Sequence, residues 1–352
     1  MLAPGAIVAN DYRIDARLGA GGMGVVWAAT HVPSGSAVAL KVIGFPESHE
    51  ARRRFLREAR AAGAIEHPNV VRILGVVALD DDSPVIVMER LWGETLKAKL
   101  EREERLSPRD TARALLPVCL AVTRAHELGV VHRDLKPSNL FYADYGAYTM
   151  AKVLDFGIAK IIGASGFGAT LAALTGNGAT LGTIGYMAPE QVDASFATPK
   201  ADVWSLGTVL YECLSGGRPV EGSTVLEFVR NAMFFGITPL AASAPDVPPE
   251  LASAVDRMLT PDAPRRPGDL AEITAVLTKL ARLAPASIVR SPQLRRRYFL
   301  STFGRLSFCC ANRPRKLASS SREVRRWWRN FSLSPSAAAA AARSEFSSIS
   351  SR

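Results

Sequence analysis

The stretch His132-Arg133-Asp134-Leu135-Lys136-Pro137-Ser138-Asn139, followed sixteen positions later by Asp155-Phe156-Gly157, is the most informative part of this 352-residue chain. Asp134 is placed to orient a substrate hydroxyl, and Lys136 is close enough in sequence to neutralise a phosphate. Asn139 and the aspartate of the second motif supply the hard oxygen ligands that Mg²⁺ prefers. These residue types in this order predict a site for phosphoryl transfer.

A glycine-rich string, Leu18-Gly19-Ala20-Gly21-Gly22-Met23-Gly24-Val25-Val26, precedes these motifs and fits the pattern G-x-G-x-x-G-x-V. Glycines let backbone amides approach phosphates because no Cβ stands in the way. Dinucleotide-binding proteins use nearly the same string, but there the loop opens a helix and an acidic residue follows about 20 positions later. Here residues 25–30 are β-branched and aromatic and predict a strand, and Lys41 ends a second predicted strand at residues 38–41. This order argues against the dinucleotide fold.

Together these motifs resemble those of protein kinases. The run Arg133-Asp134-Leu135-Lys136-Pro137-Ser138-Asn139 resembles the serine/threonine branch, in which a lysine two residues after the catalytic aspartate is typical. Two strings are similar to those of the bacterial Hanks-type group: Ala20-Gly21-Gly22-Met23-Gly24 and Tyr186-Met187-Ala188-Pro189-Glu190.

The resemblance implies an α+β fold with two lobes over residues 12–282. Residues 12–91 would form a small antiparallel β lobe with one main helix, and residues 92–282 a larger, mainly helical lobe, after a leader at residues 1–11. The implied activity uses ATP and Mg²⁺ and phosphorylates Ser and Thr of proteins, including the chain's own activation segment. A pseudokinase that binds nucleotide without efficient catalysis is the alternative; it would be expected to lack Lys41, Asp134 or Asp155, and all three are present.

The resemblance assigns catalytic roles to Asp134, Lys136, Lys41 and Glu58. Lys41 would hold the phosphates of ATP, and Glu58 would pair with Lys41. Glu58 lies in residues 48–65, which are rich in Arg, Ala, Leu and Glu and predict a helix. Two alternatives remain open: Glu58 as a surface partner of Arg54, and Glu50 as the acid that pairs with Lys41.

A nucleotide-binding surface follows from the same resemblance. The apolar run 85–89 predicts a strand, and the polar break at residues 90–93 predicts the hinge between the lobes. Backbone groups of Glu89 and Leu91 would hydrogen-bond adenine, and Met88 would be the gatekeeper as well as ordinary core filler. The residues expected to bind the nucleotide are Leu18, Gly19, Gly21, Gly24, Val26, Ala39, Lys41, Met88, Glu89, Leu91 and Phe141, and the metal ligands are Asn139 and Asp155.

Further residues are implied to support the site without touching the reacting atoms. Glu190 would pair with an arginine near the end of the domain, Arg266, and Asp202 would brace the backbone of the catalytic loop. His132 would pack against Phe156. All these roles are scaffold roles.

The activation segment, residues 155–190, is long and rich in Gly, Ala and Thr. In relatives the arginine that corresponds to Arg133 receives a phosphorylated residue of this segment, because a phosphate dianion forms strong charge-assisted hydrogen bonds. We therefore expect a switch by phosphorylation at Thr175 or Thr180, with Thr170 as the next candidate. All three lie upstream of Thr183, which in relatives contacts the catalytic aspartate and lysine in the substrate groove.

Composition favours a cytoplasmic enzyme. The chain is 48% hydrophobic, and its four cysteines, Cys119, Cys213, Cys309 and Cys310, show no metal-ligand spacing. The N-terminus lacks the features of a signal peptide, and no run approaches the roughly 20 apolar residues that span a bilayer. His126 is expected to be a surface or packing residue.

The charge is concentrated in the tail, residues 283–352. From residue 285 on there are 14 Lys and Arg against 2 Asp and Glu, whereas residues 1–284 hold 29 against 31. Disorder is the default for such a basic, Ser- and Ala-rich segment. Trp327 and Trp328 are flanked by arginines, as in segments that bind membrane surfaces or nucleic acids, so the tail predicts attachment to an anionic membrane surface. Binding to nucleic acid is a less favoured prediction, because no nucleic-acid fold is recognisable. Two further alternatives are a tail without function and a tail that docks partners or inhibits the kinase.

Overall fold

The computed structural model describes residues 2–21, 24–43, 49–81, 83–156, 184–192, 198–222 and 224–281. The chain divides into two units, Met1–Phe299 and Leu300–Arg352, and every described residue belongs to the first. The predicted phosphorylation sites, Thr183 and the tail from residue 282 on lie outside the described residues.

The small lobe is built on a six-stranded antiparallel sheet with the strand order β1-β2-β3-β4-β6-β5. Its strands are β1 (Ile7–Val8), β2 (Tyr12–Gly21), β3 (Gly24–His31), β4 (Ser36–Val42), β5 (Ile73–Ala78) and β6 (Pro84–Glu89). Side chains alternate between the faces of a strand, so every second residue meets the core. On one face Leu40 and Val87 lie in a buried cluster with Val8, Ile14, Ala29, Val38 and Val85.

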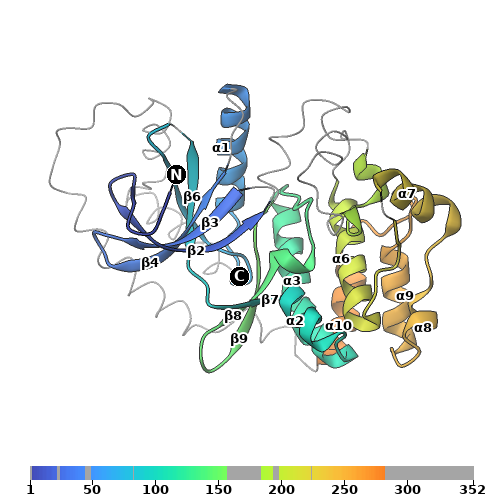
Figure 1. Ribbon diagram of the computed structural model, residues 1–352. Helices are drawn as coiled ribbons and strands as arrows, with labels where there is room; N and C mark the ends of the chain where they lie inside the picture. Colours follow the sequence, from blue (N-terminus) through green and yellow to red (C-terminus); the bar gives the residue numbers. More distant parts are fainter. Residues whose placement is uncertain are drawn as a thin grey trace, which may run out of the picture. The chain divides into compact units, whose positions relative to one another are not determined.

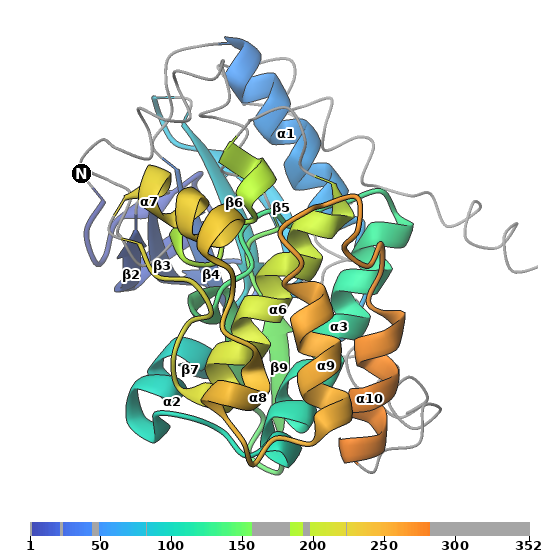
Figure 2. The ribbon, with the colours of Figure 1, turned by 90° about the vertical axis from the view of Figure 1, so that its right-hand side faces the viewer.

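One long helix, α1 (His49–Gly63), lies beside this sheet (Figure 1) and packs against β5, which is labelled in Figure 2. Phe55, Leu56, Ala59 and Ala62 are buried, which confirms the apolar stripe of the predicted helix. The strands predicted at residues 25–30, 38–41 and 85–89 correspond to β3, β4 and β6.

The large lobe combines a three-stranded sheet with helices. The sheet has the order β7 (Gly93–Thr95), β8 (Leu140–Asp144), β9 (Thr149–Val153). The helices are α2 (Leu96–Glu103), α3 (Pro108–Glu127), α6 (Pro199–Ser215), α7 (Val225–Arg230), α8 (Leu240–Ser243), α9 (Pro249–Met258) and α10 (Ala271–Ala281), with short helical turns at Pro137–Asn139, Pro189–Val192 and Asn231–Phe235. Helices α3, α6, α9 and α10 pack side by side (Figure 2). The predicted α+β fold with two lobes is confirmed.

Helix α6 is the centre of the large lobe. It is buried on all sides, with every residue from Ala201 to Tyr211 in the interior and Trp204 and Leu206 fully buried. It ends at Gly216, whose φ of 79° is the left-handed conformation that glycine adopts at low cost. Within the described ranges no helix is both long enough and apolar enough to cross a membrane.

Candidate active site

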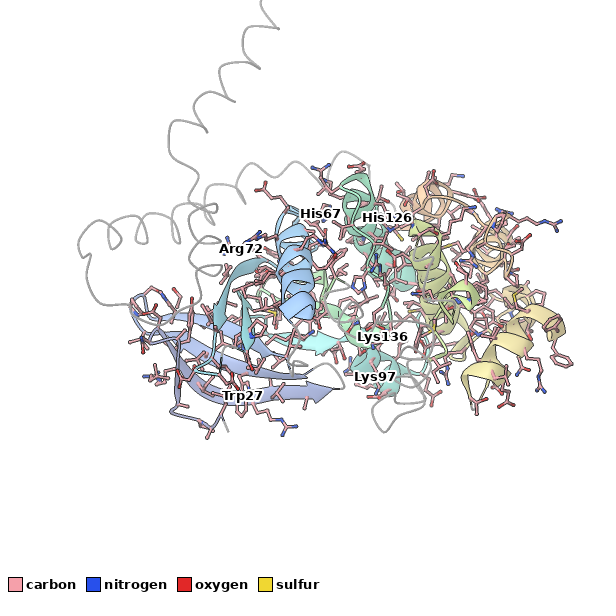
Figure 3. The ribbon with its side chains drawn as sticks, turned by 90° about the horizontal axis from the view of Figure 1, so that it is seen from above. Trp27, His67, Arg72, Lys97, His126 and Lys136 are labelled. Carbon is pink, nitrogen blue, oxygen red and sulfur yellow. The ribbon has the colours of Figure 1, made fainter. Side chains whose placement is uncertain are left out.

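The catalytic loop brings together three of the predicted residues. Asp134 is buried, with only 7% of its surface exposed, and its Oδ2 lies 2.9 Å from Lys136 Nζ. Asn139 is the last residue of the short turn Pro137–Asn139, directly before β8. Its Nδ2 donates to the backbone oxygen of Asp134 at 2.8 Å and to Asp134 Oδ2 at 3.0 Å. These bonds hold the Asp134 carboxylate in one orientation; Lys136 is labelled in Figure 3.

The backbone next to these groups is strained. Arg133 has φ 67° and Asp155 has φ 52°, a left-handed conformation that costs non-glycine residues about 1–3 kcal/mol. Such geometry persists only where neighbouring contacts impose it. At Arg133 the contact is Asp202 on α6, whose Oδ1 accepts the Arg133 N–H at 2.8 Å while Oδ2 accepts the His132 N–H at 2.7 Å. The predicted bracing role of Asp202 is confirmed.

His126 has a role that the sequence did not indicate. Its Nε2 donates to Asp202 Oδ2 at 2.8 Å, and its side chain is only 12% exposed. His126 is therefore a packing residue and not a surface residue, and the packing of α3 against α6 gives it a hydrogen-bond partner that the sequence did not predict. His132 behaves as predicted: its ring lies 4.8 Å from that of Phe156, and its Nε2 donates to the Leu154 carbonyl at 2.7 Å.

Lys41 is buried on β4, and its Nζ lies 2.8 Å from Asp155 Oδ2. The expected ion pair between Lys41 and Glu58 is absent among the described residues. Instead, Glu58 Oε1 lies 3.9 Å from Nε of its neighbour Arg57. The left-handed backbone at Asp155 presents that carboxylate to Lys41, so the lysine pairs with the predicted metal ligand and not with the α1 glutamate.

An apolar cluster lies between the small sheet and the strand that precedes Asp155. Ala39, Val71 and Met88 are its buried members, and Val26, Leu91 and Leu154 pack against them. Four residues predicted to bind the nucleotide therefore gather in one place. The sequence did not indicate Val71 or Leu154, although the position of Leu154 directly before Asp155 was a usable signal. Of the remaining predicted contacts, Phe141 is partly buried on β8 and Leu18 is 44% exposed on β2.

The described residues of the glycine string lie on β2 and β3, where Gly19 pairs with Val26 and Gly21 with Gly24. Gly24 has φ +134°, and a Cβ there would overlap the carbonyl oxygen of Val42 on β4. The requirement for glycine at this position therefore comes from the approach of two strands, independently of any phosphate.

A family model described as "protein kinase domain" matches residues 12–279. The chain belongs to the protein kinase domain family. A Corynebacterium efficiens protein described as a probable serine/threonine-protein kinase is 34% identical over 294 residues, which are 81% of this chain and 43% of that protein. The serine/threonine-protein kinase PknA of Mycobacterium tuberculosis is 35% identical over 258 residues, 72% of this chain and 57% of PknA. This chain thus spans about half the length of the curated relatives it matches.

The kinase domain also resembles solved structures. The crystal structure of the PknI kinase domain of Mycobacterium tuberculosis superposes with a TM-score of 0.62 at 23% identity, covering 80% of this chain and all of that one. At this identity the likeness shows the fold. Family membership implies use of ATP and a divalent metal ion.

The kinase domain offers a donor set that fits such an ion. Both Nδ2 bonds of Asn139 go to Asp134, which leaves its Oδ1 as the atom that can bind a metal, and Asp155 supplies a carboxylate. No cluster of three or more His, Cys, Asp or Glu that could hold a metal occurs among the described residues. A hard cation held by one carboxylate, one amide oxygen and the phosphates of a nucleotide matches this sparse set.

The kinase domain's predicted scaffold pair is present. The Arg266 side chain is fully buried and donates to both carboxylate oxygens of Glu190, at 2.6 and 3.0 Å. Its guanidinium also lies 5.0 Å from the centre of the Trp204 ring. The prediction is confirmed, and the pair ties the turn Pro189–Val192 to the segment before α10.

Proposed function

We propose that this kinase domain transfers the γ-phosphoryl group of ATP, in the presence of Mg²⁺, to Ser and Thr hydroxyls of proteins. The observation that carries the proposal is the fixed Asp134 carboxylate, which is buried, hydrogen-bonded by Asn139 and paired with Lys136. The serine/threonine preference rests on the Lys136 motif and on relatives with that description.

Each side chain has a distinct part in the proposed reaction. Asp134 orients the acceptor hydroxyl and takes its proton, and Lys136, 2.9 Å away, offsets negative charge on the transferred group. Asn139 and Asp155 would hold Mg²⁺, which supplies charge neutralisation at the phosphates. Lys41 is the cation for the remaining phosphate oxygens. The apolar cluster around Met88 and Leu154 excludes water from the adenine.

The test separates chemistry from nucleotide binding. Purified protein, radiolabelled ATP and a generic Ser/Thr acceptor should give labelled acceptor, and Asp134→Asn should reduce kcat by about 10²- to 10⁴-fold while the ATP Kd stays the same. Asp144→Asn is the matched control, because Asp144 is exposed at the end of β8. Nucleotide binding without transfer by the unaltered protein would instead support the pseudokinase alternative.

We further propose that phosphorylation at Thr175 or Thr180 activates this kinase. The support is the pairing of Lys41 with Asp155 at 2.8 Å, while Glu58 contacts Arg57. Transfer in this family needs the pair between the β-strand lysine and the helix glutamate, and phosphorylation of the activation segment controls that pair. Mass spectrometry after incubation with ATP tests the switch: full activity with an unmodified segment would refute it.

The tail from residue 283 is proposed to attach the kinase to an anionic membrane surface at the cytoplasmic face. Its surplus of basic residues is the support, since each cation near an anionic leaflet contributes on the order of 1 kcal/mol at low salt. Co-sedimentation with anionic and with neutral vesicles, beside a duplex DNA titration, should show binding to anionic vesicles only. A protein ending at Ala284 is the control; equal behaviour of both proteins would leave an inert tail.

A further inference from the structure

One buried ion pair has no part in the site described so far, which uses only the backbone of its acidic member. Among the described residues, the Lys and Arg ion pairs with both side chains less than a third exposed are Lys41–Asp155, Lys136–Asp134, Arg266–Glu190 and Lys152–Glu89. The first three belong to the active site or its support. In the fourth, Lys152 Nζ lies 2.6 Å from Glu89 Oε1, and the side chains are 8% and 16% exposed.

The Glu89 carboxylate has a second partner. Its Oε1 also accepts the backbone N–H of Arg72 at 2.8 Å, and the backbone N–H of Glu89 donates to the Arg72 carbonyl at 3.0 Å. Glu89 is the last residue of β6, where the predicted hinge begins. Its side chain therefore serves to fix the start of the hinge against the connection between α1 and β5.

The same connection is bonded to β9, the strand that carries Lys152. Asn69 Nδ2 donates to the Ala151 carbonyl at 2.7 Å, and the Val153 N–H donates to the Asn69 carbonyl at 2.7 Å. The Val71 N–H donates to the Val153 carbonyl at 2.9 Å. We call Asn69 to Arg72, Glu89 and Lys152 the hinge clamp; Figure 3 labels Arg72 and the nearby His67.

Residues of the clamp are close in sequence to those of the apolar cluster around Met88 and Leu154. Val71 and Met88, the neighbours of Arg72 and Glu89 in sequence, are two of the cluster's buried members, and Leu154 follows β9 by one residue. Asp155 comes next. A single ion pair thus links the hinge, whose backbone is proposed to bind adenine, to the strand that positions the proposed metal ligand.

The burial of Lys152 and Glu89 makes their pairing energetically important. Exposed ion pairs contribute little, but a buried carboxylate that loses its cation must be hydrated or protonated, or the backbone that carries it must move. For Glu89 any of these responses would disturb its bond to Arg72 and shift the hinge.

We propose that Lys152 is a positioning residue for ATP: through Glu89 it holds the hinge backbone at a set distance from the strand before Asp155. The proposal rests on the proposed ATP-dependent transfer. Lys152 does not touch the reacting atoms, so its loss affects nucleotide affinity much more than the chemical step.

The test compares nucleotide and acceptor parameters in three variants. Lys152→Met should raise the ATP Kd, measured with a fluorescent ATP analogue, and the ATP KM by about tenfold or more, with kcat within about twofold and the acceptor KM unchanged. Lys152→Arg should restore most of the affinity. The double variant Lys152→Met with Glu89→Gln should bind ATP more tightly than Lys152→Met alone, because it no longer buries an unpaired charge.

The matched control is Lys279→Met. Lys279 lies 2.6 Å from Glu250, the same separation, but these side chains are 67% and 60% exposed, so the ATP Kd should not change. An unchanged ATP Kd in Lys152→Met, or the absence of recovery in the double variant, would overturn the proposal. If Lys152→Met does not fold, Glu89→Gln alone should raise the ATP Kd, and an unchanged value would be equally decisive. An unaltered protein that binds the analogue but transfers no phosphate would refute the proposed function and leave this binding test intact.

Discussion

His126 near the end of α3 donates a hydrogen bond to the buried carboxylate of Asp202 on α6, at 2.8 Å. The same carboxylate accepts the backbone N–H groups of His132 and Arg133. Three donors from two parts of the chain therefore converge on one side chain. Because Arg133 is held there in a left-handed conformation, the direction of the adjacent Asp134 depends on a residue that never meets the substrate.

Replacing Asp202 should therefore impair catalysis without removing nucleotide binding. In Asp202→Asn one carboxylate oxygen becomes an NH₂ group, which opposes a backbone N–H, and a charge-assisted bond of about 1.5–3 kcal/mol is lost. We expect kcat to fall about 10- to 100-fold with an unchanged ATP Kd, measured by steady-state kinetics and nucleotide titration. His126→Gln should cause a smaller loss. An Asp202→Asn protein with the original kcat would contradict the bracing role.

Loss of Arg266 should destabilise the fold strongly. Arg266→Met leaves Glu190 without its buried partner, and removal of one member of a buried pair costs about 3–5 kcal/mol. Arg265→Met is a stringent control, because the neighbouring side chain is 83% exposed and should change the free energy of unfolding by less than about 0.5 kcal/mol. Urea denaturation of both variants measures the difference; equal values would show that the pair does not contribute.

His67 should make stability depend on pH. Burial, with the nearby charges of Arg124 and Lys152, lowers the pKa of His67 to about 4, and its Nδ1 accepts the Asn69 N–H at 3.1 Å. The contribution is complete above the unfolded pKa of about 6.5 and is lost progressively as the pH falls toward 4, since only the unfolded chain takes up the proton there.

The measurement is the free energy of unfolding between pH 7 and 4 for the unaltered protein and for His67→Gln. Because the ring is partly exposed, we expect the stability difference between the two proteins to change by only about 1–2 kcal/mol over this range. A constant difference would show that His67 titrates normally.

The two described cysteines should be unreactive in the native protein. Burial raises the pKa of Cys119 to about 12 and also raises the pKa of Cys213, so little thiolate forms at pH 8. Alkylation by iodoacetamide followed by peptide mapping should label both residues in urea but not in buffer. Rapid labelling of Cys119 in buffer would contradict the buried position on α3.

Several features could be predicted from local sequence. The strand that carries Lys41, the helix that carries Glu58 and the support of His132 by Phe156 all follow from patterns within short stretches or from motif resemblance. The alternation of apolar residues at period 2 or near 3.6 reports which face of an element is buried. This periodicity is visible in the sequence whichever element the buried face packs against.

Pairings between distant residues could not be predicted in the same way. Lys152 is an isolated polar residue in an apolar stretch, and His126 lies between Arg124 and Glu127 near the end of a helix. Neither setting indicates a partner: Glu89 and Asp202 meet these residues only in the tertiary structure. For Lys41 a partner was predicted and was wrong: the family pattern indicated Glu58, but in this structure the lysine pairs with Asp155.

The sequence by itself determined the motifs, several strands and helices and the residue types available for phosphoryl transfer, because these depend on local periodicity and on the chemistry of single side chains. The two-lobed α+β fold was implied by the resemblance of the motifs to those of protein kinases. Tertiary structure alone decided which buried charge meets which, because a buried ion's energy depends on partners within a few ångströms that can be any distance away in the chain. Lys41 is the clearest case: its strand was predictable, but its carboxylate partner was set by the backbone conformation at Asp155.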